Sequence, residues 1–296
     1  MSLKVMISIH VPKTGGTSFR RMLEDLFGDG FQPDYDWEPR PALMDGTELQ
    51  GSDDEIRAMF ENGIRCVHGH FNARKYLRLR EIEGIEPVFI TWLRDPAERC
   101  MSTYHFLRKL DTPVDEQPEW ERKAKELSLK DFFEQTRFGA NRQFAQLRAL
   151  DRDDLAFIGC TERFEDSARV FRHLFFPNAA PVAIQHELRN EERTGRYHIP
   201  APLRARLVDL NVFDEQLYQY GRGWLSGALR TLPERAGHCV FSTPAPAPVP
   251  APAPVHAEAT PAQPESAPSF ARLWQSFGRR ISRSESESGR RPGQNR

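Results

Sequence analysis

A short stretch near the N-terminus combines a lysine, two glycines and three hydroxyl side chains. Residues 12–18 read Pro-Lys-Thr-Gly-Gly-Thr-Ser, with an apolar run before them and an amphipathic run after them. Glycine lets the backbone turn tightly and brings its N–H groups close to a ligand without an intervening Cβ. The N-terminus of a following helix would add free N–H groups and the positive end of its dipole. The stretch therefore predicts an anion site for a phosphate or sulfate, made of Lys13, Thr14, Gly15, Gly16, Thr17 and Ser18.

The order of these residues bears on the kind of anion. In the nucleoside-triphosphatase loop GxxxxGK[ST] the lysine follows the glycines, whereas Lys13 precedes Gly15 and Gly16. This order disfavours an ATPase, although it leaves a nucleotide open. An ordinary strand-to-helix turn could use the same two glycines, and the lysine and hydroxyls around them favour the anion site.

Two histidines flank a glycine at the end of a second apolar segment. Cys66-Val67 is predicted to end a short strand, and His68 and His70 follow it. Imidazole titrates near neutral pH, so either side chain could be a general base. A structural role for both is the alternative. The spacing offers no third ligand for a metal, so we predict a metal-free site in which one histidine accepts a proton.

An arginine follows the clearest predicted strand. Residues 87–93 are nearly all apolar, which is typical of a buried parallel strand. Asp95 and Pro96 after Arg94 suit the N-cap and first position of a helix, and Ser102 lies two helical turns further on. Arg94 and Ser102 could grip a phosphate, the arginine through a bidentate fork. The alternative is a capped helix with Arg94 in a surface ion pair.

The elements that position these groups alternate between strands and helices. Short apolar runs predict strands at 5–9, 66–67, 87–93 and 155–160. Amphipathic runs predict helices at 19–27, 53–60, 129–138, 164–174 and, as one final helix, about 202–220. This order implies a three-layer α/β/α fold with a central, mainly parallel sheet. The carboxyl ends of parallel strands share one edge, so Lys13, the two histidines and Arg94 can converge there.

Two further stretches allow more than one interpretation. Residues 28–53 are rich in Gly and Pro and predict an irregular surface excursion, whose Tyr35 and Trp37 could line a cleft or pack on the body. Asn141 and Gln143 could present amides to a sugar-like substrate or form a polar turn.

Composition divides the chain into a folded body and a tail. The 296 residues are 39% hydrophobic and carry a formal net charge of −1. Residues 240–269 are rich in alternating Pro and Ala, which is typical of an extended linker. We therefore predict a domain at 1–239, a disordered linker at 240–269, and a basic tail at 270–296. A mildly acidic body is not typical of a nucleic-acid-binding protein.

The tail could form a basic amphipathic helix. Its apolar residues fall on one helical face, with arginines around them: Phe270, Leu273, Trp274, Phe277 and Ile281. Such a helix at 270–283 predicts a peripheral contact with a membrane surface or a protein groove. A tail that never folds is the alternative.

The cysteines and the N-terminus bear on location. The four cysteines are scattered without a CxxC pair, which favours reduced thiols over disulfides or a zinc site. The first strand is expected almost at the N-terminus, and no run approaches about 18 apolar residues, so we expect neither a signal peptide nor a membrane span. These features predict a cytoplasmic protein, which the tail could bring to the inner face of the membrane.

Three motifs together resemble a known family. PKTGGTSF after a strand, VHGH, and WLRDPAERCMSTYHFLR occur in that order. They are similar to motifs of the sulfotransferases that use 3′-phosphoadenosine 5′-phosphosulfate (PAPS). The closest branch contains the heparan sulfate and dermatan sulfate 2-O-sulfotransferases. The resemblance spans about residues 7–211 and includes FIGCTERFED.

The resemblance implies which groups bind the donor. Residues 13–18 would form a P-loop-like loop around its 5′-phosphosulfate. Arg94 and Ser102 would hold its 3′-phosphate. Arg189 and Arg193 would close over the nucleotide.

The resemblance also implies the chemistry. His68 would be the general base, His70 would assist it or contact the acceptor, and Lys13 would stabilise the charge that develops. The reaction would transfer a sulfuryl group from PAPS, without a metal, to a hydroxyl of a carbohydrate or glycolipid. Animal members have a membrane anchor and act in the secretory lumen. A cytoplasmic enzyme would instead meet a soluble, lipid-linked or nascent glycan, which is therefore the expected acceptor here.

Two other classes of function use the same residues. An ATP-dependent, kinase-like phosphotransferase is disfavoured by the position of Lys13 and by the lack of an obvious magnesium carboxylate after a strand. A non-catalytic nucleotide-binding adaptor would act through the predicted C-terminal helix.

Overall fold

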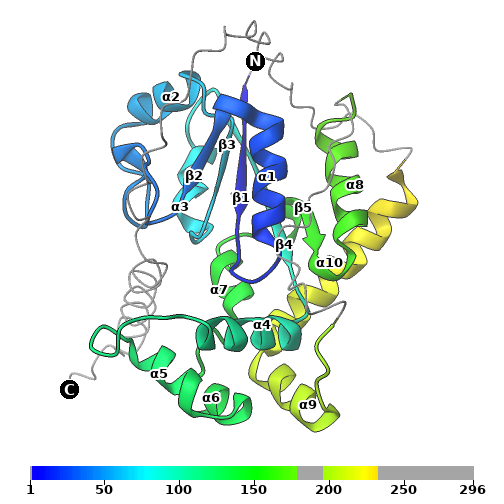
Figure 1. Cartoon of the computed structure of the whole chain (residues 1–296). Helices are drawn as coiled ribbons and strands as arrows, with labels where there is room; N and C mark the ends of the chain where they lie inside the picture. The colour runs from blue at the N-terminus through cyan, green and yellow to red at the C-terminus, as the bar shows by residue number, and fades with distance from the viewer. Residues whose placement is uncertain (1, 179–195, 233–296) are drawn as a thin grey trace, which may run out of the picture.

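The strand that leads into the glycine turn is the centre of a parallel sheet. The computed structural model describes residues 2–178 and 196–232. Its sheet has the order β2-β3-β1-β4-β5, and every neighbouring pair is parallel. The strands are β1 (Leu3–Ile9), β2 (Phe31–Asp34), β3 (Cys66–Gly69), β4 (Ile85–Leu93) and β5 (Leu155–Cys160). Helices cover both faces of this sheet (Figure 1), so the predicted α/β fold is confirmed.

Burial explains why β1 and β4 are apolar along most of their length. Both are interior strands, and interior parallel strands are covered on both faces. Val5, Met6 and Ile7 of β1 are completely buried. The chain leaves β1 toward β2 and later returns to form β4 on the other side of β1. The carboxyl ends of β1 and β4 therefore flank a topological switch point, where open α/β sheets bind ligands.

Two helices cover one face of the sheet and a third covers the other. Phe19 of α1 (Gly16–Phe27) and Phe171 of α8 (Phe164–Phe175) have ring centroids 5.1 Å apart, and Phe171 also packs on Phe157 of β5. The neighbouring Ile158 points to the opposite face. There it meets Gly221 of α10 (Val212–Arg230).

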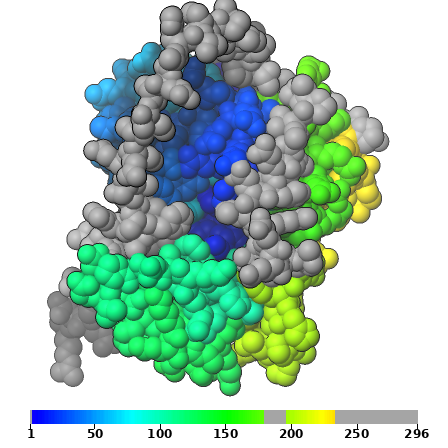
Figure 2. All heavy atoms as spheres, in the orientation of Figure 1, coloured from blue at the N-terminus to red at the C-terminus, as the bar shows by residue number. Residues whose placement is uncertain are grey.

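Four helices form a separate layer across the carboxyl edge of the sheet (Figure 1). These are α4 (Pro96–Arg108), α5 (Glu119–Glu126), α6 (Leu129–Thr136) and α9 (Ala201–Leu210). They share a small core of their own, built of Ala97, Cys100, Tyr104, Leu107, Leu110, Ala124, Phe132, Phe133 and Leu207. In the space-filling view, the green residues of α4–α6 form a continuous mass beneath the blue N-terminal residues (Figure 2). This layer faces the end of the sheet where the predicted site lies.

The other elements are short. The remaining helices are α2 (Asp53–Glu61), α3 (Arg74–Leu77) and α7 (Arg142–Leu147). Single turns of 3-10 helix lie at Gly28–Gly30, Ala42–Met44, Arg78–Arg80, Arg152–Asp154 and Thr161–Arg163. Ser52 caps α2 with a reciprocal capping box to Glu55, which confirms the predicted start of that helix.

Three features differ from the sequence prediction. The excursion 28–53 contains β2, which was not expected because it includes Pro33; this proline is tolerated since β2 is an edge strand. Strand β3 continues to Gly69, so His68 lies inside the strand rather than after it, paired with Ser8. The single helix predicted at 202–220 is two helices, α9 and α10, separated at Asn211.

Several predicted segments lie outside the described residues: Arg189, Arg193, the linker 240–269 and the tail 270–296. Within the described ranges, no helix combines the length and apolarity needed to cross a bilayer.

Substitution of Gly69 tests the close approach of β2 to β3. A Cβ at Gly69 would lie 1.9 Å from the Asp34 carbonyl oxygen, which is backbone and cannot swing away. We expect Gly69→Ala to lower the free energy of unfolding by about 2–3 kcal/mol or more, measured by urea denaturation. The control is Gly223→Ala on α10, where a Cβ meets nothing within 4 Å. It should stabilise the protein by about 0.5–1 kcal/mol. Equal effects of the two substitutions would contradict this packing.

Candidate functional site

The loop from β1 to α1 makes a tight turn. Lys13 and Gly15 both have left-handed conformations, with φ angles of 71° and 86°. Gly15 occupies the N-cap position of α1 but has no side chain to cap it, and the first turn of the helix contains no acidic residue. The first N–H groups of the helix therefore remain available to an external anion.

Lys13 supplies the positive charge of this loop. Its Nζ atom lies 4.1 Å from the ring centroid of Phe106 on α4, a cation–π distance. Burial, followed by the charges of Arg94 and Lys109, lowers the pKa of Lys13 to about 8. Three cations thus gather at this point, and an anion bound among them would offset their mutual repulsion.

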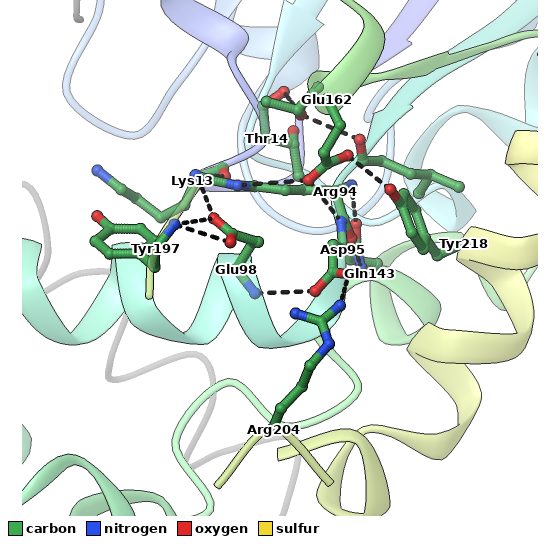
Figure 3. A network of polar contacts seen from close by, with 12 residues as sticks. Lys13, Thr14, Arg94, Asp95, Glu98, Gln143, Glu162, Tyr197, Arg204 and Tyr218 are labelled. Atoms are coloured by element: carbon green, nitrogen blue, oxygen red, sulfur yellow. Dashed lines mark hydrogen bonds and ion pairs between the residues drawn. The ribbon is translucent and has the colours of Figure 1, made fainter. Parts of the chain in front are cut away.

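Arg94 lies beside Lys13 at the same edge of the sheet (Figure 3). Its Nη1 atom donates a hydrogen bond to the Lys13 carbonyl oxygen at 3.2 Å. The buried side chain of Gln143 fixes the backbone of Arg94. Its Oε1 atom accepts from the Arg94 N–H at 2.8 Å, and its Nε2 atom donates to the Arg94 carbonyl at 2.9 Å. The amide of Gln143 is thus engaged with Arg94 rather than presented to a substrate.

Two buried carboxylates orient the Arg94 guanidinium. Its Nη2 atom lies 3.4 Å from Glu98 Oε2, and its Nε atom lies 3.9 Å from Glu162 Oε1. Both distances exceed the 2.7–2.9 Å of a strong charge-assisted hydrogen bond, so neither carboxylate forms a tight bidentate fork with it. Glu98 also accepts from the Tyr197 backbone N–H at 2.9 Å, and Glu162 accepts from the Tyr218 hydroxyl at 2.9 Å. Burial raises the pKa of Glu162.

The other predicted donor-binding residues take different positions. The Thr14 side chain is completely buried and donates to the Val11 carbonyl at 2.7 Å, so its hydroxyl shapes the loop. Thr17 is exposed and Ser18 is half-buried on the first turn of α1. Ser102 is half-buried on α4, two turns from its start. Asp95 caps α4 as predicted, by accepting from the Glu98 N–H at 3.1 Å.

His68 is held deep in the sheet. Only 1% of its surface is exposed, and its Nδ1 atom lies 2.8 Å from the Ser8 hydroxyl on β1. Its buried Nε2 atom has no hydrogen-bond partner among the residues that the structure describes. His70, after the end of β3, is only half-buried. Of the two predicted histidines, His70 is therefore the more accessible.

A third histidine, His10, joins the two that the sequence predicted. Its ring stacks on His68 with a centroid distance of 5.1 Å and an interplanar angle of 13°, and its centroid lies 4.5 Å from that of His70. Sequence reasoning missed His10 because it lies between the first predicted strand and the motif that begins at Pro12. The signal that could have found it is the register: Ile9 pairs with Gly69, so His10 and His70 directly follow the ends of neighbouring strands.

Aromatic side chains wall the histidines on one side. The ring centroids of Tyr35 and Trp37 lie 4.8 and 5.5 Å from that of His70, on the segment that follows β2. The neighbouring Asp34 anchors this segment, because its buried carboxylate accepts from Lys75 Nζ at 2.6 Å and the Tyr76 hydroxyl at 2.8 Å. The sequence left open whether Tyr35 and Trp37 line a cleft or pack on the body. In the structure they pack on the body and also lie beside His70.

All three imidazoles are neutral near pH 7. Burial, followed by the charges of Lys13 and Arg20, lowers the pKa of His10 to about 3. Burial is also the first cause, and the charge of His10 the second, of a pKa well below the usual range for His68 and His70. Neutral imidazoles can accept a proton, and an anion bound nearby would favour their charged form. In the described part of the chain, no cluster of three His, Cys, Asp or Glu side chains could hold a metal ion.

The three neutral histidines make stability depend on pH. Each has a pKa near 6.5 when unfolded and a lower one when folded, so the unfolded chain binds more protons below pH 6.5. We expect the free energy of unfolding to fall as the pH drops from 7 to 5, by up to roughly 1.4 kcal/mol per pH unit for each histidine. Urea denaturation at several pH values measures this loss. His10→Gln should remove one histidine's share, and an unchanged slope in that variant would contradict a neutral His10.

No known family model matches the chain, and no curated protein sequence is significantly similar to it. The function is therefore inferred from the geometry of the site.

Proposed function

We propose that the protein is a sulfotransferase that transfers a sulfuryl group from PAPS to a hydroxyl of a carbohydrate or glycolipid acceptor. The observation that carries this proposal is the contact between Arg94 and Lys13, where the guanidinium donates to the lysine carbonyl at 3.2 Å. This contact places two cationic residues at the same edge of the sheet: Lys13 on the glycine turn and Arg94 after the neighbouring strand. This arrangement suits a donor with a phosphosulfate at one position and a phosphate at another.

The residues around Lys13 and Arg94 supply the rest of the chemistry. The acceptor oxygen forms a bond to sulfur while the bond from sulfur to the 5′-phosphate oxygen breaks, and adenosine 3′,5′-bisphosphate leaves. Lys13 and the first N–H groups of α1 stabilise the charge that develops on the bridging oxygen. Positioning and charge stabilisation provide most of the catalysis, as in phosphoryl transfer.

We assign the general base to His68 and the acceptor contact to His70. In the tautomer whose Nδ1–H donates to the Ser8 hydroxyl, the Nε2 atom of His68, which has no hydrogen-bond partner among the described residues, carries the lone pair that accepts the proton. His70 is the more exposed of the two and lies beside Trp37, a flat surface of the kind on which sugar rings pack.

The kinase alternative lacks a free carboxylate after β4. Asp95, the first carboxylate beyond that strand, caps α4 and forms an ion pair with Arg204. This commits its side chain to structure rather than to a magnesium ion.

We also propose a reducing, cytoplasmic location and a metal-free reaction. The three cysteines in the described residues, Cys66, Cys100 and Cys160, are buried free thiols, which suits a reducing compartment. A peripheral membrane or protein contact through residues 270–283 remains part of the proposal.

Ligand binding and transfer test the proposal. Calorimetry should show adenosine 3′,5′-bisphosphate binding at least tenfold more tightly than ATP, without added magnesium. Radiolabelled sulfate should pass from PAPS to at least one glycan or glycolipid of a panel. Preference for ATP with magnesium would support the kinase. Tight bisphosphate binding with no transfer to any acceptor would support the non-catalytic adaptor.

His68→Ala should separate catalysis from donor binding. We expect turnover to fall by roughly 10²–10⁴ because the proton acceptor is lost, with the affinity for adenosine 3′,5′-bisphosphate within about threefold of wild type. His173→Ala on α8, outside the cluster, is the matched control and should keep wild-type turnover. If His68→Ala lost affinity and turnover to the same extent, His68 would not be the base.

A further inference from the structure

His10 has no part in the proposed reaction, yet it contacts both the first turn of α1 and the proposed base His68. It lies directly after β1, where its N–H donates to the Gly69 carbonyl at 2.9 Å and its carbonyl accepts from Gln146 Nε2 at 3.3 Å. These bonds fix its backbone between β3 and α7. The position of the ring then follows from its side-chain contacts.

On one side, the ring meets the first turn of α1. A Cβ at Gly16 would lie 1.7 Å from His10 Nε2 and 2.1 Å from Cε1, well inside the ring. Only glycine leaves room for the imidazole at this position. The ring therefore packs against the backbone of the helix turn that the proposed donor would approach.

On the other side, the ring meets the proposed base. The imidazoles of His10 and His68 are nearly parallel, at 13° and 5.1 Å. A hydroxyl holds each Nδ1 atom at 2.8 Å, from Tyr35 for His10 and from Ser8 for His68. Because these hydroxyls come from two different segments, the stack has a fixed plane as well as a fixed separation.

We propose that His10 is a positioning residue, which holds His68 at a fixed distance from the first turn of α1 by packing against both. This inference rests on the proposed function, because it assumes that His68 removes the acceptor proton. His10 does not itself touch the reacting atoms. It keeps water away from His68 and keeps the base aligned with the donor loop.

The groups that face His68 determine how the pKa of His68 would change if His10 were replaced. Arg20 of α1, His10 after β1 and His70 after β3 are its titratable neighbours, and Tyr35 lies 6.0 Å away between ring centroids. Burial first, and then His10 and Arg20, lower the pKa of His68. Replacing His10 by a small side chain would admit water and raise that pKa. Since only the neutral imidazole is a base, the acid limb of the rate profile would move to higher pH.

The test measures His10→Ala and Tyr35→Phe in the full chain. For His10→Ala we expect kcat to fall roughly 10- to 100-fold, with the affinity for adenosine 3′,5′-bisphosphate within about threefold of wild type. The acid limb of kcat/KM should rise by about one pH unit. Tyr35→Phe removes only the hydroxyl that holds the ring, and should shift kcat and the acid limb less, in the same direction. An unchanged acid limb in both variants would overturn the inference, because a merely structural role lowers the folded fraction without moving it.

A second measurement does not depend on activity. Nuclear magnetic resonance of histidine-labelled protein, assigned with His68→Ala, follows the titration of His68 directly. The inference predicts that this titration moves to higher pH in Tyr35→Phe and further in His10→Ala. If His68 shifts but no sulfate is transferred, the proposed function fails and the role of His10 in holding His68 stands. If sulfate is transferred but His68 does not shift, the inference about His10 fails alone. Should His10→Ala not fold, Tyr35→Phe decides between these outcomes.

Discussion

Parallel pairing of β1 with both β3 and β4 is the constraint on which the whole site depends. Because all five strands run in the same direction, the residues that follow β1, β3 and β4 meet at one edge of the sheet. Lys13, His70 and Arg94 come from those three positions. A shift of β3 by one residue would turn His68 to the opposite face, away from Ser8 and His10. Strand register thus sets the geometry of the chemistry.

The charge balance at this edge supports the proposal of an anionic ligand. Lys13 and Arg94 are held close together, and the carboxylates near Arg94 lie too far away to neutralise it through tight hydrogen bonds. Three neutral imidazoles lie beside these cations, because burial disfavours their charged forms. A doubly phosphorylated ligand would lower the repulsion between the cations and make proton uptake by the imidazoles easier.

Local patterns predicted the parts of the site that depend on nearby residues. The strand–glycine–helix unit, the Asp95 cap and the convergence of Lys13 with Arg94 follow from short motifs and the parallel-sheet rule. The rest depends on contacts between distant segments. Gln143 reaches Arg94 across 49 residues, and His10 is placed by a register that no single segment encodes. Strand β2 was missed because its segment is rich in Gly and Pro; Pro33 is tolerated there because β2 is an edge strand, and sequence alone does not say which strand is at the edge.

The most direct test of the proposed site is whether Lys13 and Arg94 bind two different phosphates of one nucleotide. Calorimetry would compare adenosine 3′,5′-bisphosphate with adenosine 5′-monophosphate in wild type, Lys13→Met and Arg94→Met. The wild type should prefer the bisphosphate by roughly 10- to 100-fold, the scale of hydrogen bonds to a charged group. Arg94→Met should lose that preference, whereas Lys13→Met should weaken both nucleotides equally. A preference for the bisphosphate that survives in Arg94→Met would contradict the proposed donor site.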